Sequence, residues 1–232
     1  MTTISNNFHQ VRQRVAAACA AAQRPVNDVT LLAVSKTFGP EAVRELNACG
    51  QLAFGENYIQ EAVEKMALLS DLPLEWHCIG PIQSNKTRLV ATHFHWAHTV
   101  DRLKIAERLS QQRPEHLPPL QVTIQVNVDG GATKSGVPPG EALALARAVS
   151  ALPRLRLRGL MSVPDPADDY ASQYAVHLRA RELLDELVAA GLPLDTLSVG
   201  MSADLEAAIE AGSTMVRVGT ALFGGRAGAA KG

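Results

Sequence analysis

The chain has 232 residues, 47% of them hydrophobic, and its 22 basic and 23 acidic residues leave a formal net charge of −1 at pH 7. This length suits a single α/β barrel, so we expect one domain over residues 1–232 with a core from about residue 5 to 226. The balanced charge gives no field that would gather nucleic acid or anionic lipid, and no apolar run reaches membrane-spanning length. A nucleic-acid or membrane partner is therefore not expected.

Cysteine usage indicates a reducing compartment. Cys19, Cys49 and Cys78 are odd in number and lack C-x-x-C spacing, so they indicate neither a disulfide framework nor a zinc site. The alanine-rich run VAAACAAA after Arg14 continues into a polar helix and does not resemble a signal peptide. We therefore expect a cytoplasmic protein with reduced thiols.

Short segments rich in Val, Ile and Leu alternate along the chain with longer segments of helical periodicity, a pattern that predicts βα units and a parallel sheet. A helix over about 5–23 comes first. The predicted strands cover 30–35, 52–57, 75–80, 95–100, 120–128, 157–163, 196–201 and 215–224. Between them, helices are predicted from Pro40 to Gly50, after an N-cap pair of Asn57 and Gln60, and over 85–91, 101–112, 139–151, 171–190 and 203–211.

These elements predict an α/β fold, a (β/α)8 TIM-type barrel with an extra N-terminal helix. A doubly wound sheet would more often carry a Gly-rich fingerprint after its first strand, and the sequence has neither G-x-G-x-x-G nor a Walker loop. The C-terminal tail AGAAKG is expected to be disordered.

In such barrels, binding and catalytic residues lie where strands end and βα loops begin. The stretch AVSKTF ends an apolar strand with Lys36, which is either a solvated residue or an amine at the mouth of a pocket. The other residues at strand ends are Asn57, His77, Asn127, Met161, Ser162, Gly200, Met201, Ser202, Arg217, Gly219 and Thr220.

Two strand-end loops form a candidate phosphate site. In GMSAD, Gly200 allows close backbone approach and Ser202 is predicted at a helix N-terminus, where unpaired amides attract an anion. Gly219 and Thr220 follow the last strand, and the loops after strands 7 and 8 are the usual phosphate location in this fold. Each piece alone is better explained as a cap or a turn than as a phosphate site. Together they favour a phosphate.

A lysine beside a phosphate site suits a phosphorylated aldehyde. The amine has a pKa near roughly 10.4 in water, and burial lowers that value and frees the lone pair for a carbonyl. Two ligand classes fit, sugar phosphates and pyridoxal 5'-phosphate (PLP). Arg217 shares a strand face with Gly219 and only donates hydrogen bonds, so it would leave a pyridine nitrogen unprotonated. The alternative is that Arg217 pairs with a carboxylate such as Glu56.

Six motifs carry a family resemblance: AVSKTF, FGENYIQE, WHCIGPIQSNK, NVDGGATKSG, RGLMSVP and LSVGMSADLEAAIEAGSTMVRVGTALFG. In this order, they resemble the pyridoxal phosphate homeostasis protein family, which is similar to the N-terminal barrel domain of alanine racemase. The match covers about residues 5–226. Small departures, such as SVGM where SMGM is common, lie outside the central motif residues.

The resemblance implies that Lys36 holds PLP as a Schiff base and that Arg217 faces the pyridine nitrogen. It implies that Ser202, Gly219 and Thr220 hold the phosphate, with Gly200 and Met201 in the same loop, and that Asn57, His77, Met161 and Ser198 lie near the ring. Lys134 matches a second family lysine near the pocket entrance, a candidate for cofactor transfer. No catalytic residue and no metal ligand is expected.

The sequence favours a non-catalytic role. Racemisation needs a second base, which alanine racemase takes from a tyrosine of a C-terminal domain that we expect to be missing here, and Tyr58, Tyr170 and Tyr174 fall on predicted helices. A neutral pyridine is also a weak electron sink. We expect a monomeric PLP carrier in intracellular vitamin B6 homeostasis, with PLP-dependent apoenzymes as candidate recipients. A racemase-like amino-acid enzyme and a Schiff-base sugar-phosphate lyase remain alternatives.

The remaining charged residues and histidines that were considered as binding residues are interpreted as structural. His93, His95 and His98 match no metal-ligand spacing. A solvated rim at the barrel face opposite the site explains Arg154, Arg156 and Arg158 better than a nucleic-acid stripe does. Lys86 and Arg88 are assigned to a helix surface.

Overall fold

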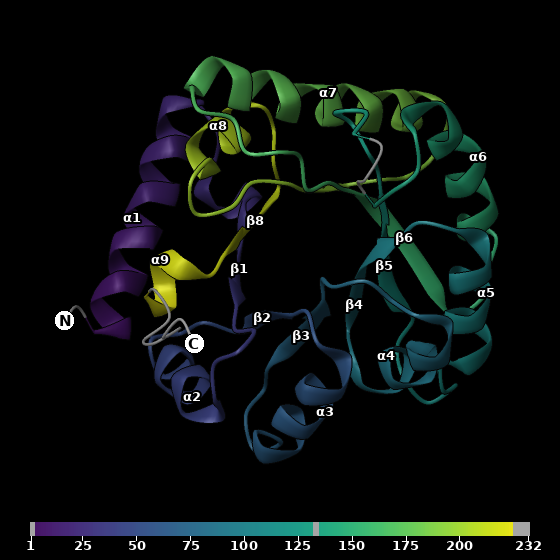
Figure 1. Ribbon diagram of the computed structural model, residues 1–232, viewed down its shortest axis with the longest axis horizontal. Coiled ribbons are helices and arrows are strands. Elements are labelled where there is room, and N and C mark those ends of the chain that lie inside the picture. Colours follow the sequence, from purple (N-terminus) through teal and green to yellow (C-terminus); the bar gives the residue numbers. More distant parts are fainter. Residues whose placement is uncertain (1–2, 132–134, 225–232) are drawn as a thin grey trace, which may run out of the picture.

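Eight parallel strands close into a barrel in the computed structural model, which describes residues 3–131 and 135–224. Helices surround the strands, as Figure 1 shows. Neighbouring strands follow chain order, and β8 pairs with β1 to complete the ring. The strands are β1 (Thr30–Val34), β2 (Ala53–Glu56), β3 (Glu75–Cys78), β4 (Trp96–Val100), β5 (Leu120–Gln125), β6 (Leu155–Met161), β7 (Thr196–Ser198) and β8 (Met215–Val218). The predicted barrel is confirmed.

The helices alternate with the strands. They are α1 (Ile4–Ala21), α2 (Pro40–Ala48), α3 (Ile59–Leu68), α4 (Thr87–His93), α5 (Leu103–Gln112), α6 (Pro139–Ser150), α7 (Tyr170–Ala189), α8 (Leu205–Glu210) and α9 (Thr220–Phe223), with 3-10 turns η1 (Val26–Asp28) and η2 (Ser84–Lys86). Within the described residues, no helix combines the length and apolar character needed to cross a membrane.

The main hydrophobic core lies between the strands and the surrounding helices. It includes outward-facing strand residues such as Ala33 and Phe54, packed against helix residues such as Val43. A second, small apolar cluster contains Leu32, Ala53, Trp96 and Met215. Because alternate residues of a strand share a face, His98 and Arg217 lie on the same faces as Trp96 and Met215. The barrel interior therefore combines a small apolar cluster with buried polar side chains.

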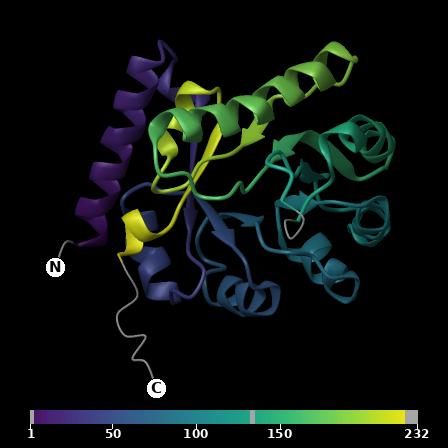
Figure 2. The same ribbon diagram turned by 45° about the horizontal axis from the view of Figure 1, so that its top comes forward.

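The predicted N-terminal helix is confirmed as α1. It packs beside α8 and α9, as Figure 2 shows. The Asn7 side chain is buried and donates to the Leu222 carbonyl of α9 at 2.9 Å. Arg14 donates to Glu206 of α8 and to the Ser202 carbonyl at 3.0 Å. This helix thus braces the loops after β7 and β8.

Several predicted boundaries are wrong. The strand predicted over 215–224 ends at Val218, and residues 220–223 form α9, because the apolar run VRVGTALF serves first a strand and then a short helix that buries Leu222 and Phe223. The predicted N-cap pair does not form, since α3 begins at Ile59 with Tyr58 as its N-cap and without a side-chain cap. The predicted disordered tail lies outside the described residues.

Candidate functional site

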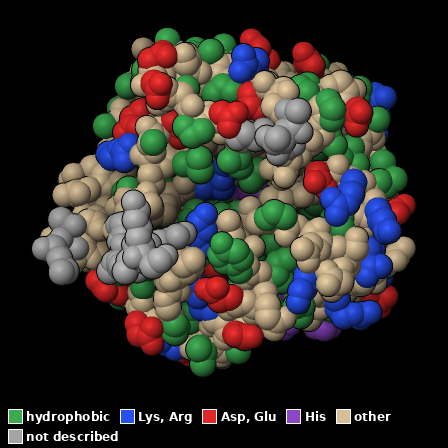
Figure 3. All heavy atoms as spheres, in the orientation of Figure 1, with side chains coloured by type: hydrophobic (Ala, Val, Ile, Leu, Met, Phe, Trp, Pro, Cys, Tyr) green, Lys and Arg blue, Asp and Glu red, His purple; other side chains and the backbone are tan. Residues whose placement is uncertain are grey.

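A cavity of about 360 Å³ opens at the carboxyl ends of the strands. Figure 3 shows a hollow on this face, with basic side chains among apolar ones. The predicted residues that line the cavity are Lys36, Asn57, Met161, Met201, Ser202, Arg217, Gly219 and Thr220. Residues far apart in the sequence thus meet at one end of the barrel, as the fold predicted.

Lys36 occupies a sharp turn just beyond β1. The Ser35 amide still bonds to the Gly55 carbonyl of β2 at 3.0 Å, which extends the pairing by one residue. Thr37 then adopts a φ of 66°, a left-handed conformation that is an outlier for a β-branched residue. The half-buried Lys36 side chain lines the cavity. The strained turn therefore places the amine at the cavity instead of continuing the strand.

A buried ionic cluster lies behind this turn. Glu56 Oε1 accepts from Ser35 Oγ and from Lys65 Nζ, both at 2.6 Å, and Lys65 also donates to the Ser35 carbonyl at 2.9 Å. Burial raises the pKa of Glu56, against the opposing effect of Lys65. The alternative pairing of Arg217 with Glu56 is wrong, because Lys65 holds this carboxylate. Sequence reasoning missed Lys65, because no local feature of the sequence distinguishes it from a surface lysine.

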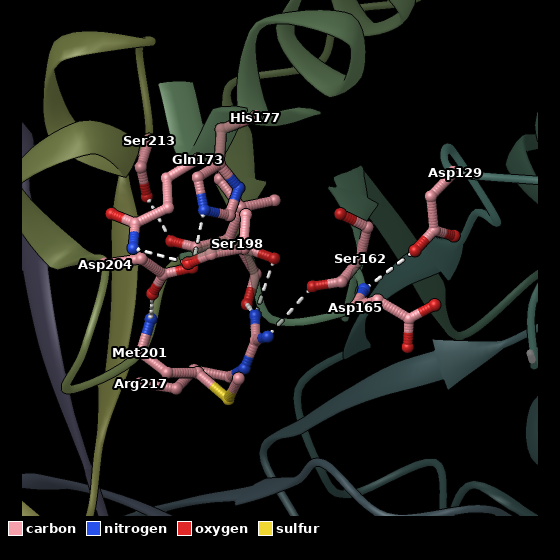
Figure 4. A network of polar contacts seen from close by, with 12 residues as sticks. Asp129, Ser162, Asp165, Gln173, His177, Ser198, Met201, Asp204, Ser213 and Arg217 are labelled. Carbon is pink, nitrogen blue, oxygen red and sulfur yellow. Dashed lines mark hydrogen bonds and ion pairs between the residues drawn. The ribbon is translucent and has the colours of Figure 1, made fainter. Parts of the chain in front are cut away.

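Arg217 is almost fully buried at the floor of the cavity. Its Nη1 donates to the Ser198 carbonyl at 2.6 Å and to Ser198 Oγ at 2.8 Å, and its Nη2 donates to the Ser162 carbonyl at 2.9 Å (Figure 4). Burial lowers the pKa of Arg217 to about 10. Three hydrogen bonds to β7 and the end of β6 thus fix a guanidinium that also lines the cavity.

Two features fix the conformation of the loop after β7. Gly200 has a φ of 93°, and a Cβ there would lie 2.4 Å from the Ala208 Cβ, so only glycine fits. Asp204 accepts from the Met201 amide at 2.6 Å and contacts His177 Nε2 at 2.8 Å (Figure 4). Ser202 lies in a turn before α8, which begins at Leu205, so its predicted place at a helix N-terminus is wrong.

The loop after β8 lies beside this turn. Thr220 Oγ1 donates to Ser202 Oγ at 3.3 Å, which brings the two predicted phosphate loops together. Gly219 is the N-cap of α9, and a Cβ there would lie 3.3 Å from the Val34 carbonyl. Two hydroxyls and a close-packed glycine therefore line the same cavity as Lys36.

Three predicted site residues do not line the cavity. Ser198 is fully buried beneath it and holds Arg217. Gly200 shapes the loop after β7, as described above. His77 is fully buried deeper in the barrel and contacts His98 and Glu75. Lys134 lies outside the described residues.

The residues interpreted as structural lie in varied places. His98 is buried in the barrel interior, while His95 Nδ1 accepts from the Trp76 amide at 2.9 Å. Arg158 donates to Asp195 at 2.8 Å and stacks over Trp96, 4.9 Å from the ring centroid. It thus lies at the amino ends of the strands, away from the cavity. No group of three or more metal-ligand side chains is found in the part of the chain that the structure describes.

The sequence matches the alanine racemase N-terminal domain family over residues 4–227. The pyridoxal phosphate homeostasis protein of Pseudomonas aeruginosa is 60% identical over 226 residues, which cover 97% of each chain. This chain belongs to the pyridoxal phosphate homeostasis protein family. The Escherichia coli K12 family member is 52% identical, with 97% of this chain and 98% of that protein covered.

A solved structure shares the whole barrel. PipY of Synechococcus elongatus, solved with PLP bound, has a TM-score of 0.81 and 39% identity, and the match covers 92% of this chain and 100% of that one. The resemblance that the six motifs predicted is therefore confirmed. For a pyridoxal phosphate homeostasis protein, the relevant test of this structure is whether its cavity fits PLP.

The residues present fit such a cofactor. PLP has an aldehyde, a pyridine nitrogen and a phosphate, and the cavity offers an amine, a fixed guanidinium and two facing hydroxyls. The apolar side chains of Ile79, Met161 and Val163 line the same cavity and can contact a ring.

Proposed function

We propose that this protein binds PLP as a Schiff base on Lys36 and serves in PLP homeostasis without appreciable turnover. The observation that carries the proposal is the convergence of Lys36, Arg217, Ser202 and Thr220 on one cavity. The names of the relatives and the PLP-bound PipY structure support the choice of ligand.

Each polar group has a distinct task in this proposal. Lys36 would supply the amine for a Schiff base with the aldehyde, and the two amine hydrogens would leave with the aldehyde oxygen as water. The hydroxyls of Ser202 and Thr220, with the backbone at Gly219, hold the phosphate. Arg217 lies at the floor and faces the pyridine nitrogen. Asn57 and Met161 line the ring, and Lys134 is a candidate for cofactor transfer.

The same arrangement disfavours catalysis. Arginine does not give up its proton in ordinary conditions, so Arg217 leaves the pyridine nitrogen unprotonated and the ring a weak electron sink. None of the three tyrosines lines the cavity. Tyr58 is 53% exposed, and Tyr170 bonds to Glu210 away from the site. A second base of the racemase type is therefore not provided by these tyrosines.

One observation favours a second candidate, a small PLP-dependent amino-acid enzyme. A cavity of about 260 Å³ adjoins the site, shares Ile79, Met161 and Val163 with it, and adds the polar side chains of Thr99 and Gln125. This adjoining cavity has room for an amino acid whose amine would replace that of Lys36 on the cofactor. The same Lys36 and phosphate groups would also serve a sugar-phosphate lyase, but Arg217 at the floor suits a pyridine ring better.

We further propose a cytoplasmic monomer that delivers PLP to apoenzymes. The three cysteines are free, with Cys19 and Cys78 buried, which suits a reducing compartment. Sedimentation equilibrium of the purified protein tests the monomer, and transfer of PLP to an added apoenzyme tests delivery.

The deciding experiment is an absorption spectrum followed by borohydride reduction and peptide mapping. We expect a yellow protein whose reduced adduct maps to Lys36, loss of that adduct in Lys36→Ala, and no change in the control Lys104→Ala on the α5 surface. A protein that PLP cannot convert to a coloured form would disprove the proposal. Exchange of the amino-acid Cα proton with solvent at enzyme-like rates would favour the enzyme.

A further inference from the structure

Five side chains form a column of hydrogen bonds through the barrel, from the cavity floor to the opposite end. Arg217 Nη1 lies 2.8 Å from Ser198 Oγ, which lies 3.0 Å from His98 Nδ1. His98 Nε2 lies 2.8 Å from His77 Nδ1, and His77 Nε2 lies 2.8 Å from Glu75 Oε1. Four members are buried, and the Glu75 side chain is 49% exposed at the start of β3. The column connects the guanidinium of the site with the far end of the barrel.

The direction of donation is fixed from the Glu75 end. An ionised carboxylate only accepts, so His77 Nε2 must carry the hydrogen. A neutral His77 then has a bare Nδ1, which accepts from His98 Nε2. His98 Nδ1 is bare in turn and accepts from the Ser198 hydroxyl. Burial lowers the pKa of both histidines, which keeps them neutral.

The Arg217 end is satisfied by the same direction. A guanidinium only donates, so Ser198 Oγ accepts from Arg217 and its own hydrogen is free for His98. In a reversed column the His98 Nδ1 hydrogen would also point at Ser198 Oγ, so both lone pairs of this oxygen would accept and the serine hydrogen would lose His98 as its acceptor. Donation from Arg217 to Glu75 is therefore the arrangement in which each hydrogen between neighbouring members of the column has an acceptor.

Packing holds the central rings in place. The Trp96 ring stacks on His77 at 5.2 Å between centroids and 10° between planes, and the Arg158 guanidinium lies over the Trp96 ring, 4.9 Å from its centroid. His77 and His98 meet edge to face at 5.1 Å. Rotation of either imidazole would disturb these contacts, so the column cannot easily rearrange to suit a different end group.

We propose that Glu75 is a positioning residue for Arg217, acting through the column. By accepting at the far end, Glu75 sets the histidine tautomers that let Ser198 donate to His98. The lone pairs of Ser198 Oγ are then left to Arg217, and this holds the guanidinium at the cavity floor. The identity of the ligand rests on the proposed function, whereas the column consists only of side chains of this protein and does not depend on a ligand.

The test compares Glu75→Lys with Glu75→Gln. Lysine only donates and therefore opposes the direction of the column, whereas glutamine can still accept. Glu115→Lys is the charge-matched control, because Glu115 precedes β5 at the same end of the barrel, is 90% exposed and touches no member of the column. The half-exposed position of Glu75 permits folding of both variants.

The first measurements need no ligand. Nitrogen NMR of the wild type should show the Nε2-protonated tautomer for His77 and His98, and Glu75→Lys should shift His77 toward the Nδ1-protonated form. Exchange of the Arg217 Nε hydrogen should become faster in Glu75→Lys and stay unchanged in Glu115→Lys. A purely structural Glu75 would not alter the tautomers in a folded protein.

The second measurement is a PLP titration. We expect the Kd for PLP to rise at least about fivefold in Glu75→Lys, the lower end of typical coupling between sites, less in Glu75→Gln, and not in Glu115→Lys. An Nδ1-protonated histidine in the wild type, or unchanged Arg217 exchange and Kd in Glu75→Lys, would overturn the proposal. If the wild type fails to bind PLP, the proposed function fails, while the tautomers and Arg217 exchange still decide the role of Glu75.

Discussion

The ammonium of Lys65 lies 2.6 Å from a carboxylate oxygen of Glu56, and both side chains are buried behind the turn that carries Lys36. The second carboxylate oxygen, Glu56 Oε2, has no hydrogen-bond partner in the described structure. The hydrogen bonds from Lys65 and Ser35 therefore offset the cost of burying this carboxylate.

Lys65→Met should be strongly destabilising, because it leaves Glu56 as an unpaired buried charge. Removing one partner of such a pair costs about 3–5 kcal/mol. Urea unfolding gives the free-energy change directly. The matched double variant, Lys65→Met with Glu56→Gln, should recover part of the loss, since the carboxylate charge is then gone. Equal stability of the single and double variants would contradict this account.

Gly200→Ala should destabilise the loop after β7, because the new Cβ would lie 2.4 Å from the Ala208 Cβ at a φ of 93°. The matched control is Gly191→Ala, which has a φ of 95° and no atom within 4 Å of its Cβ. The control should lose about 1 kcal/mol from backbone strain alone, and Gly200→Ala about 1–3 kcal/mol more from overpacking. Urea unfolding gives the loss of stability in each variant. Similar losses in Gly200→Ala and Gly191→Ala would show that the contact with Ala208 does not destabilise the loop.

Stability should fall as the pH drops below about 6.5, the ordinary pKa of histidine. Burial lowers the pKa of His98 well below its usual value, so the unfolded state binds a proton that the folded state does not. The sign follows from linkage: the stabilisation is complete above the unfolded pKa and is lost as the pH falls toward the folded pKa.

Urea unfolding between pH 5.5 and 7.5 measures this slope, in a range above the usual pKa of carboxylates. Each such histidine contributes up to about 1.4 kcal/mol per pH unit. His98→Gln should give a flatter profile than the wild type, and His116→Gln, at an exposed loop position, should not. Parallel profiles for all three proteins would show that His98 titrates normally.

Arg217→Lys should weaken PLP binding although the charge is kept. The guanidinium makes three hydrogen bonds to Ser198 and Ser162 in fixed directions, and a lysine ammonium cannot reproduce this planar arrangement. We expect a rise of about tenfold in the Kd for PLP, or about 1.4 kcal/mol. Arg156→Lys, at the far end of β6, is the control. Unchanged affinity in Arg217→Lys would mean that charge alone suffices.

The sequence by itself determined the barrel and most of the cavity wall. Eight apolar segments alternating with helical ones leave few other folds, and the rule that strand ends meet at one face selected Lys36, Ser202, Arg217 and Thr220 without any coordinates. These predictions depended on the local hydrophobic pattern and on the symmetry of a parallel barrel. Both can be recognised in the amino-acid sequence.

Only the tertiary structure decided which buried polar groups pair. Nothing local distinguishes Lys65 from a surface lysine, yet packing of α3 brings it to Glu56 and removes that carboxylate from Arg217. Likewise, nothing local in the sequence links His77 with His98, and their strands bring them together with Ser198 across the barrel. Such pairings depend on the direction in which each side chain points and on its position along the barrel axis. Hydrophobic periodicity alone does not specify either of these.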